Sequence, residues 1–359
     1  MRPLPAVQAI NRKSSKMGVD RMKRILAAGS VALLATLSAG HASDAKSDVK
    51  EIRIIESGGT SGESIDIAYG APFTEATGVR LVREQPPSLG KLKAMVKSGN
   101  VTADLMELSG PGVETARAQG LIEDLDWDLI DPQDMNEEAR LPYAFGYQYF
   151  ALFLASMPDA KPVNSWQEFW DTERQPGRRA IPAYARYALP LALLADGVKP
   201  DELYPLDIDR ALASIDRIKD DLILWEAASQ TPQLLKSKEA VYVATWDNVF
   251  EEDGFFVNFA PGIWDVAYFV MPKGAPNPEL AMKLLHEMSK VENQARAAEI
   301  TPVAGPSPTI MDHISPAIQA KMPTNPELRK TQAGSDRMWW AEHGDEAERR
   351  WSEYMLKNF

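Results

Sequence analysis

The sequence contains no cysteine among its 359 residues, which excludes disulfide bonds and thiolate zinc sites. Histidine is also scarce, because the chain has four, and His286, His313 and His343 show no H-E-x-x-H or other ligand spacing. A metallohydrolase or a histidine-based catalytic triad is therefore not expected. Positive charge is in deficit too, with 39 Lys and Arg against 51 Asp and Glu, a formal net charge of −12. Because phosphate backbones repel such a chain, we expect no nucleic-acid partner.

The first 42 residues have the composition of a cleavable export signal. The basic segment Arg21–Arg24 precedes an apolar stretch at 25–40, and Gly40-His41-Ala42 places small residues at −3 and −1 of a cleavage site. The apolar stretch is shorter than the roughly 20 residues that span a bilayer, so a membrane anchor is the weaker interpretation. We expect a periplasmic protein after removal of residues 1–42. The remaining 32 basic and 50 acidic residues give it a formal charge of −18.

From residue 49 onward, short apolar runs alternate with amphipathic stretches, a pattern that predicts an α/β fold with a mainly parallel sheet. The expected strands are 52–55, 79–83, 103–107, 179–182, 239–245 and 265–271, with extended chain at 141–154. The expected helices include 64–77, 188–196, 207–220, 277–289 and 345–357. Gly78 is predicted to end the first helix, since glycine is favoured just beyond a helix.

The loop Glu56–Glu63 (ESGGTSGE) connects the first expected strand to the first expected helix. It fits none of three enzyme or nucleotide templates: the G-x-S-x-G nucleophile elbow, G-x-G-x-x-G, or a P-loop ending in G-K-[ST]. Its glycines, among them Gly59, allow the backbone to approach a solute, and Ser57, Thr60 and Ser61 offer hydroxyls near a helix N-terminus. We therefore expect a ligand-binding loop that favours a negatively charged group.

Seven short phrases occur in one order over about residues 50–310: PFTEATGV at 72–79, ADL at 103–105, QGLI at 119–122, LPY at 141–143, NSW at 164–166, ATW at 244–246 and MPKGA at 271–275. Together they resemble the extracellular solute-binding proteins of ATP-binding-cassette (ABC) importers, in the branch that includes the spermidine and putrescine receptors. The resemblance implies a two-lobed periplasmic-binding-protein fold of type II, in which hinge motion closes a cleft around the solute. It also implies ABC permease subunits as partners, a monomer, no cofactor and no enzymatic activity.

The two lobes are expected to share the chain discontinuously. Lobe 1 is predicted at 49–147 plus 266–314, and lobe 2 at 148–265 plus 315–359. The C-terminal segment would then wrap around and connect the lobes.

The resemblance also implies a set of ligand-binding residues. In polyamine receptors, aromatic rings hold the aliphatic chain and carboxylates bind its ammonium ends. Trp246 and Trp264 match that role by position, and Asp247 and Asp265 lie beside them. Each tryptophan could instead be a core residue, and each aspartate a solvated loop residue. Ser109 follows the strand 103–107, where a hydroxyl would face the cleft or simply cap the next helix.

The sequence departs from the polyamine pattern at Ala183–Tyr187, where Tyr184 and Tyr187 replace two expected carboxylates. Arg186 between them is suited to a carboxylate or phosphonate, unless it points to solvent. Tyrosines can also hold ferric ion, but the adjacent pair typical of such receptors is missing.

The main prediction is therefore a receptor for an amine-containing solute, a polyamine such as putrescine or spermidine. The alternative is a zwitterion of the γ-aminobutyrate or aminophosphonate type. Its ammonium would meet Trp246, Trp264, Asp247 or Asp265, and its anion would meet Arg186 and the loop Glu56–Glu63. Ferric ion is the less favoured third possibility.

Overall fold

The computed structural model describes residues 51–246, 254–301, 303 and 305–359. The expected export signal and Asp247 lie outside these residues. The described residues all belong to one compact unit, 48–359. No helix among them has the length and apolar character required to cross a membrane.

The strands form one mixed sheet in the order β2-β1-β3-β10-β6-β9-β7-β8, with β4 and β11 paired to β10 and β5 paired to β6. Their bounds are β1 (Glu51–Ile55), β2 (Arg80–Glu84), β3 (Leu105–Ser109), β4 (Ile122–Glu123), β5 (Arg140–Leu141), β6 (Ala144–Ser156), β7 (Arg179–Pro182), β8 (Leu222–Trp225), β9 (Tyr242–Thr245), β10 (Phe256–Pro272) and β11 (Ala333–Gly334). The expected strands 52–55, 79–83, 103–107, 179–182, 239–245 and 265–271 are thereby confirmed as β1, β2, β3, β7, β9 and part of β10.

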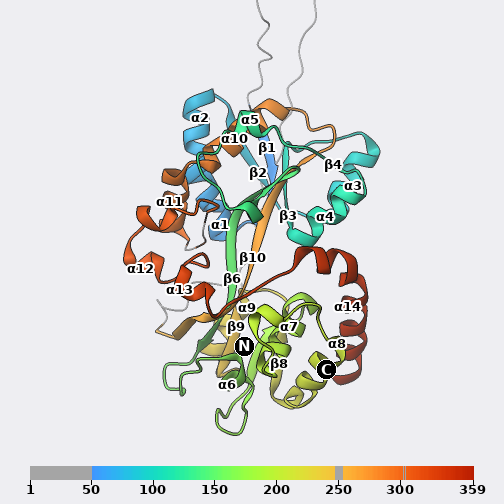
Figure 1. Cartoon of the computed structure of the whole chain (residues 1–359), viewed down its shortest axis with the longest axis vertical. Coiled ribbons are helices and arrows are strands. Elements are labelled where there is room, and N and C mark those ends of the chain that lie inside the picture. Colours follow the sequence, from blue (N-terminus) through green and yellow to red (C-terminus); the bar gives the residue numbers. More distant parts are fainter. Residues whose placement is uncertain (1–50, 247–253, 302, 304) are drawn as a thin grey trace, which may run out of the picture. The chain divides into compact units, whose positions relative to one another are not determined.

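Two long antiparallel strands, β6 and β10, connect two parallel groups of strands (Figure 1). We call β1, β2 and β3 the first group and β7, β8 and β9 the second group; each group is parallel within itself. β10 joins the first group through β3, at Ala267–Val270, and β6 joins the second group through β9, at Phe153–Ser156. The chain therefore crosses between the groups in extended conformation, as the aromatic-rich run 141–154 predicted.

Helices cover both groups of strands. Their bounds are α1 (Gly59–Ser64), α2 (Ala71–Thr77), α3 (Leu89–Ser98), α4 (Gly110–Ala118), α5 (Trp127–Ile130), α6 (Trp166–Trp170), α7 (Ala185–Ala195), α8 (Ile208–Asp216), α9 (Gln230–Lys236), α10 (Pro278–Ser289), α11 (Val291–Ile300), α12 (Pro316–Gln319), α13 (Pro326–Arg329) and α14 (Arg337–Asn358), with a π-helical stretch Ile65–Gly70 between α1 and α2. Two apolar cores lie against the first group and one against the second. Burial of these apolar surfaces is the main favourable contribution to folding.

The first helix begins five residues earlier than expected, at Gly59 instead of Ser64. The stretch GTSGES carries no apolar residues, so hydrophobic periodicity could not reveal it. Its buried positions are occupied by Gly62 and Ser64, which fit because they are small. The predicted stop is confirmed, because Gly78 adopts a left-handed conformation (φ 73°) and its amide bonds the carbonyl of Thr74.

The C-terminal helix α14 contacts elements next to both groups of strands. Near its start, Arg337 forms an ion pair with Glu114 of α4 at 2.8 Å. Further along, the fully buried Trp351 donates a hydrogen bond to the carbonyl of Ala183, which precedes α7 (2.8 Å). Figure 1 shows this helix in dark red along one side of the described chain. It begins eight residues before the expected helix 345–357, because Asp336 accepts bonds from the amides of its first turn.

Candidate functional site

A pocket of about 280 Å³ lies where the first group of strands ends. Its lining comes from the chain after β1 and β2, from the end of β3 and the start of α4, and from the two long strands: Ser57, Pro87, Ser88, Leu89, Glu107, Leu108, Ser109, Gly112, Phe150 and Ala267. The carboxyl ends of parallel strands are the usual place for a ligand in an open α/β sheet. Two of the expected site residues, Ser57 and Ser109, therefore share one pocket.

Glu107 and Ser57 are hydrogen-bonded to each other in this pocket. The backbone amide of Ser57 donates to one carboxylate oxygen of Glu107 (2.9 Å), and its hydroxyl donates to the other (2.7 Å). Burial raises the pKa of Glu107, while the hydrogen bonds from Ser57 and Tyr147 lower it in part. Ser109 is exposed at the start of α4, and its side chain forms no capping bond.

A second carboxylate lies behind the loop Glu56–Glu63. Glu56 is fully buried, accepts a bond from the amide of Gly58 (2.5 Å) and forms an ion pair with Arg83 (2.6 Å). Two amides of this loop are thus occupied by carboxylates of the protein itself. That arrangement argues against the expected anion-binding role of the loop, because a bound anion would lie near two negative charges.

The other expected loop residues differ in their surroundings. Gly59 and Thr60 are exposed in the first turn of α1. The hydroxyl of Ser61 donates to the side-chain oxygen of Gln148 at 2.6 Å, which connects α1 to β6. Gln148 lies opposite Ala267, a lining residue of the pocket. Ser61 is therefore placed beside the pocket through Gln148.

Arg186 and Asp265 form a buried ion pair. Arg186 comes from the first turn of α7 and Asp265 from β10, opposite the pocket residue Phe150. The side chains of Arg186 and Asp265 are 14% and 4% exposed. Asp265 also accepts a bond from the amide of Val266 (2.8 Å), whereas the Nε of Arg186 is buried without a hydrogen-bond partner. The expected solvent-facing alternative for Arg186 is wrong, and the charge of Asp265 is already matched by a cation.

An aromatic cluster lies next to Arg186. The guanidinium of Arg186 is 5.8 Å from the ring centre of Tyr187, which packs 5.1 Å from the half-buried Trp246. Trp246 also meets Trp225 edge to face at 4.8 Å. Tyr184 is exposed and its hydroxyl donates to the carbonyl of Glu226. Tyr187, Arg186 and Trp246 are thus brought together as expected.

Trp264 is separated from Asp265 by the sheet itself. Adjacent residues of a strand point to opposite faces, and Trp264 packs beside Tyr149 at 6.2 Å. The guanidinium of Arg329 lies 3.6 Å above its ring, and Gly334 closes against its edge. A shared role for Trp264 and Asp265 around one ammonium group is therefore not supported by the geometry.

Glu107, Gln148 and Phe150 were not expected in the site. Alternation along the strand that begins at 103 would place Glu107 on the same face as Ser109, and this pattern could have identified Glu107 as a candidate site residue. Gln148 and Phe150 lie within an aromatic run in which no single position stood out. Their placement depends on pairing with β10, which the sequence does not specify.

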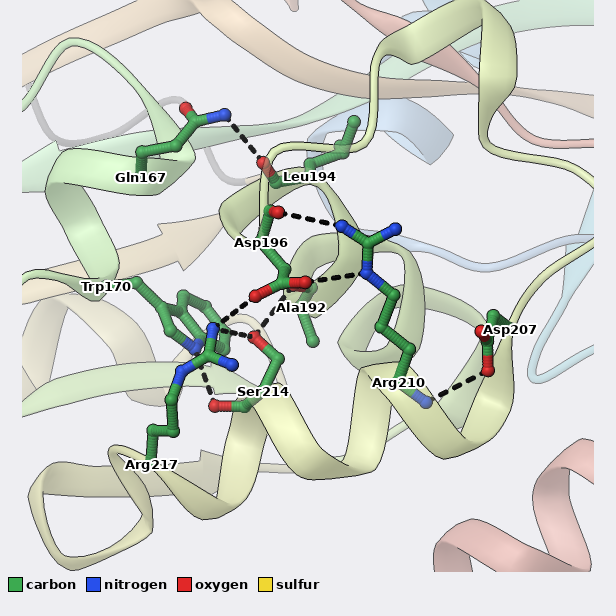
Figure 2. Close-up of polar contacts among 9 residues, drawn as sticks. All are labelled: Gln167, Trp170, Ala192, Leu194, Asp196, Asp207, Arg210, Ser214 and Arg217. Atoms are coloured by element: carbon green, nitrogen blue, oxygen red, sulfur yellow. Dashed lines mark hydrogen bonds and ion pairs between the residues drawn. The ribbon is translucent and has the colours of Figure 1, made fainter.

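A second pocket, of about 220 Å³, lies beside α8 and includes Asp207 and Arg210 in its lining. Figure 2 shows that the neighbouring charges are already matched, since Asp196 receives bonds from both Arg210 and Arg217 (2.6 Å each). The hydrogen bond to Arg210 is the main cause that holds the pKa of Asp196 below its ordinary value. Asp207 caps α8 by accepting a bond from the amide of Arg210. Among the side chains drawn, Arg210 and Arg217 are thus paired with Asp196, and Asp207 serves as a helix cap.

In the described part of the chain, no group of three or more His, Cys, Asp or Glu side chains is arranged to hold a metal ion. Tyr184 and Tyr187, which raised the possibility of ferric ion, are engaged with Glu226 and Trp246.

Comparison with known proteins gives one family. The sequence profile described as bacterial extracellular solute-binding protein matches residues 68–327. A gamma-aminobutyric acid-binding protein of Pseudomonas aeruginosa is 29% identical over 335 residues, which cover 88% of this chain and 94% of that protein.

Solved structures are similar over most of the chain. The structure described as the Atu4243-GABA receptor has 31% identity and a TM-score of 0.78, covering 85% of this chain and 97% of that one. The protein AgtB from A. tumefaciens R10, in complex with agropinic acid, has 30% identity and a TM-score of 0.75, with 85% and 98% covered. A spermidine/putrescine transporter protein from Streptococcus pneumoniae has 17% identity and a TM-score of 0.68 over 85% and 99%, a likeness of fold alone.

Proposed function

This chain belongs to the bacterial extracellular solute-binding proteins, and on that premise we propose that it captures a small zwitterion with an ammonium group and a carboxylate or phosphonate. Its fold is the α/β fold of type II periplasmic binding proteins, as expected. It is the solute-binding component of an ABC transporter and not an enzyme. The chemical class of the solute is the part that we propose.

The observation that carries the proposal is the ion pair between Arg186 and Asp265. Asp265 was the expected partner of an ammonium group, but its charge is already matched by Arg186. A second ammonium of a diamine would therefore compete with a buried guanidinium for this carboxylate. A carboxylate or phosphonate, in contrast, would meet a guanidinium whose buried Nε is without a partner.

The relatives support the same direction. The curated relative and one solved structure are named for γ-aminobutyric acid, and another solved structure holds agropinic acid. Both solutes are acids, as a site built around Arg186 requires. The polyamine, our main prediction from the sequence, has support only from a protein that shares the fold. Ferric ion has no supporting observation.

Other parts of the account are also proposals. We propose export through cleavage of residues 1–42, periplasmic location, and a monomer that delivers its solute to ABC permease subunits. The lobe boundaries 49–147 plus 266–314 and 148–265 plus 315–359 remain predictions. They agree with the position of β6 and β10, in which the chain crosses between the two groups of strands.

The experiment is a thermal-shift screen followed by calorimetry with γ-aminobutyrate, 2-aminoethylphosphonate, putrescine and spermidine. A ligand at a hundredfold excess over its Kd stabilises the folded state by about 2.7 kcal/mol, which such a screen detects. We expect stabilisation by a zwitterion and little or none by the two polyamines. A protein stabilised by putrescine alone would contradict the proposal.

A further inference from the structure

We infer that the carboxylate of Glu107 binds the ammonium group of the solute, with Ser57 as its hydrogen-bonding partner. The inference rests on the proposed function, because it assumes a solute that carries an amine. The sequence presents Glu107 only as the last residue of the expected strand 103–107, and its place in the pocket gives it this role.

The position of Glu107 is built by two elements of the first group of strands. It lies in β3, in register with Phe269 of β10, and the backbone that follows β1 brings Ser57 to both of its oxygens. The same pocket is also lined by Leu108, Phe150 and Ala267. A short aliphatic amine would thus find apolar walls around one negative group, the arrangement typical of small-molecule sites.

The charges around the site single out Glu107. Three other carboxylates of the elements that build the site each hold an arginine: Glu56 with Arg83, Asp265 with Arg186, and Glu114 with Arg337. Glu107 has no cation within ion-pair distance among the described residues. Its partners there are neutral donors from Ser57 and Tyr147.

A carboxylate in this environment is short of compensating charge. Burial raises its pKa, Glu56 adds to that effect, and the hydrogen bonds from Ser57 and Tyr147 oppose it. The titratable groups that face Glu107 are thus Glu56, after β1, and Tyr147, in β6. A buried charge is stabilised when a counter-charge with matching hydrogen bonds arrives, and an ammonium supplies both.

The second end of the solute lies along β10. Asp265 and Ala267 are two residues apart on one face of this strand, a separation of about 7 Å. Asp265 holds Arg186, and Ala267 lines the pocket that contains Glu107. Arg186 and Glu107 therefore offer opposite charges on one face of the sheet, Glu107 for the ammonium and Arg186 for the anion.

The first experiment compares paired probes on two variants. γ-Aminobutyrate and butyrate differ by the amine, as do 2-aminoethylphosphonate and ethylphosphonate. We expect wild-type protein to favour the amine-bearing member of a pair by at least about tenfold, because a hydrogen bond to a charged group contributes roughly 1.5–3 kcal/mol. Glu107→Gln should remove that preference and weaken amine binding at least about tenfold. Glu75→Gln, at an exposed position of α2, should leave it unchanged.

The second experiment measures proton release when the solute binds to the wild-type protein. An ammonium beside Glu107 lowers the raised pKa of that carboxyl, so binding should release protons near pH 5 and fewer near pH 8. Calorimetry of γ-aminobutyrate in buffers of different ionisation enthalpy measures the release. Glu107→Gln serves as the control, in which the release should disappear.

The outcomes separate the inference from the proposed function. If the affinity of Glu107→Gln for an amine probe stays within twofold of the wild-type affinity, the inference alone is overturned. The same holds if binding of the probe to wild-type protein releases no protons near pH 5. Binding of putrescine alone, weakened by Glu107→Gln, supports the inference and overturns the zwitterion proposal. If none of γ-aminobutyrate, 2-aminoethylphosphonate and putrescine binds the wild-type protein, both are overturned.

Discussion

The guanidinium of Arg186 is bound to the carboxylate of Asp265, although the two residues are 79 positions apart in the sequence. The pair joins the first turn of α7 to β10, where Asp265 lies opposite the pocket residue Phe150 of β6. It fixes a guanidinium at the edge of the site and removes Asp265 as a free acceptor for a cation. The proposed preference for a solute with a negative end follows from this pair.

Replacing Arg186 alone would leave Asp265 buried and unpaired, at a cost of about 3–5 kcal/mol of stability. The double variant Arg186→Gln/Asp265→Asn avoids that charge. We expect it to fold and to bind γ-aminobutyrate at least about tenfold more weakly, because a charged hydrogen bond contributes roughly 1.5–3 kcal/mol. Calorimetry measures the affinity, and Arg296→Gln, exposed on α11, is the control. Unchanged affinity in the double variant would rule out Arg186 as the anion contact.

Trp246 tests the aromatic part of the site. Trp246 packs on Tyr187 beside Arg186, at the end of the site proposed for the anion. Because an aromatic pair contributes about 0.5–1.5 kcal/mol, Trp246→Ala should disturb that contact and weaken binding of the solute by roughly 2- to 12-fold. Trp246→Phe keeps a ring against Tyr187 and Trp225 and should lose less. Equal affinity in wild type and Trp246→Ala would make this tryptophan a packing residue only.

Glu107→Gln should raise the thermal stability of the ligand-free protein. Because the folded-state pKa of Glu107 is raised, the native state binds more protons than the unfolded state, and stability falls as pH rises through the raised pKa. The variant lacks this loss, so its Tm should exceed that of wild type near pH 8 and approach it near pH 5. Scanning calorimetry at both pH values decides this, and a lower Tm near pH 8 would contradict it.

Gly62 lies against the ion pair between Arg83 and Glu56, behind the loop Glu56–Glu63, and leaves no room there for a side chain. A Cβ at this position would lie 2.2 Å from a guanidinium nitrogen of Arg83, which Glu56 and Asp66 hold in place. Gly62→Ala should therefore destabilise the protein by about 1–3 kcal/mol in chemical denaturation. The matched change Gly90→Ala in α3 meets nothing closer than 3.9 Å and should be neutral or stabilising by up to about 1 kcal/mol. The reverse order would disprove this explanation of Gly62.

Asp196 gives a pH dependence of the opposite sign. The pKa of Asp196 is lowered, chiefly by the hydrogen bond from Arg210 and then by that from Arg217 (Figure 2). The ionised carboxylate therefore stabilises the folded protein above the ordinary pKa, and this contribution is lost as the pH falls through the lowered pKa. At neutral pH we expect Asp196→Asn to lose about 1 kcal/mol of stability, and the difference to vanish in acid. The control Asp159→Asn, at an exposed position, should leave the stability within about 0.5 kcal/mol of wild type. Urea denaturation at several pH values tests both.

The order of strands and helices could be predicted from the sequence, because strands such as 52–55 and 179–182 are short apolar runs and Gly78 marks the end of a helix. It could not reveal α1, whose buried residues are glycine and serine. The ion pair of Arg186 with Asp265 depends on a tertiary contact between residues far apart in the sequence, so the sequence alone does not reveal that the charge of Asp265 is matched. The sequence does indicate that Trp264 and Asp265 lie on opposite faces of the sheet, since neighbouring residues of a strand point to opposite sides.

The most direct test of the central claim is one calorimetric comparison of γ-aminobutyrate, 2-aminoethylphosphonate and putrescine on the wild-type protein. The account predicts that at least one of the two zwitterions binds more tightly than putrescine, by at least about tenfold, since Asp265 is already paired with Arg186. Putrescine as the tightest ligand of the three, or no binding by either zwitterion, would contradict it.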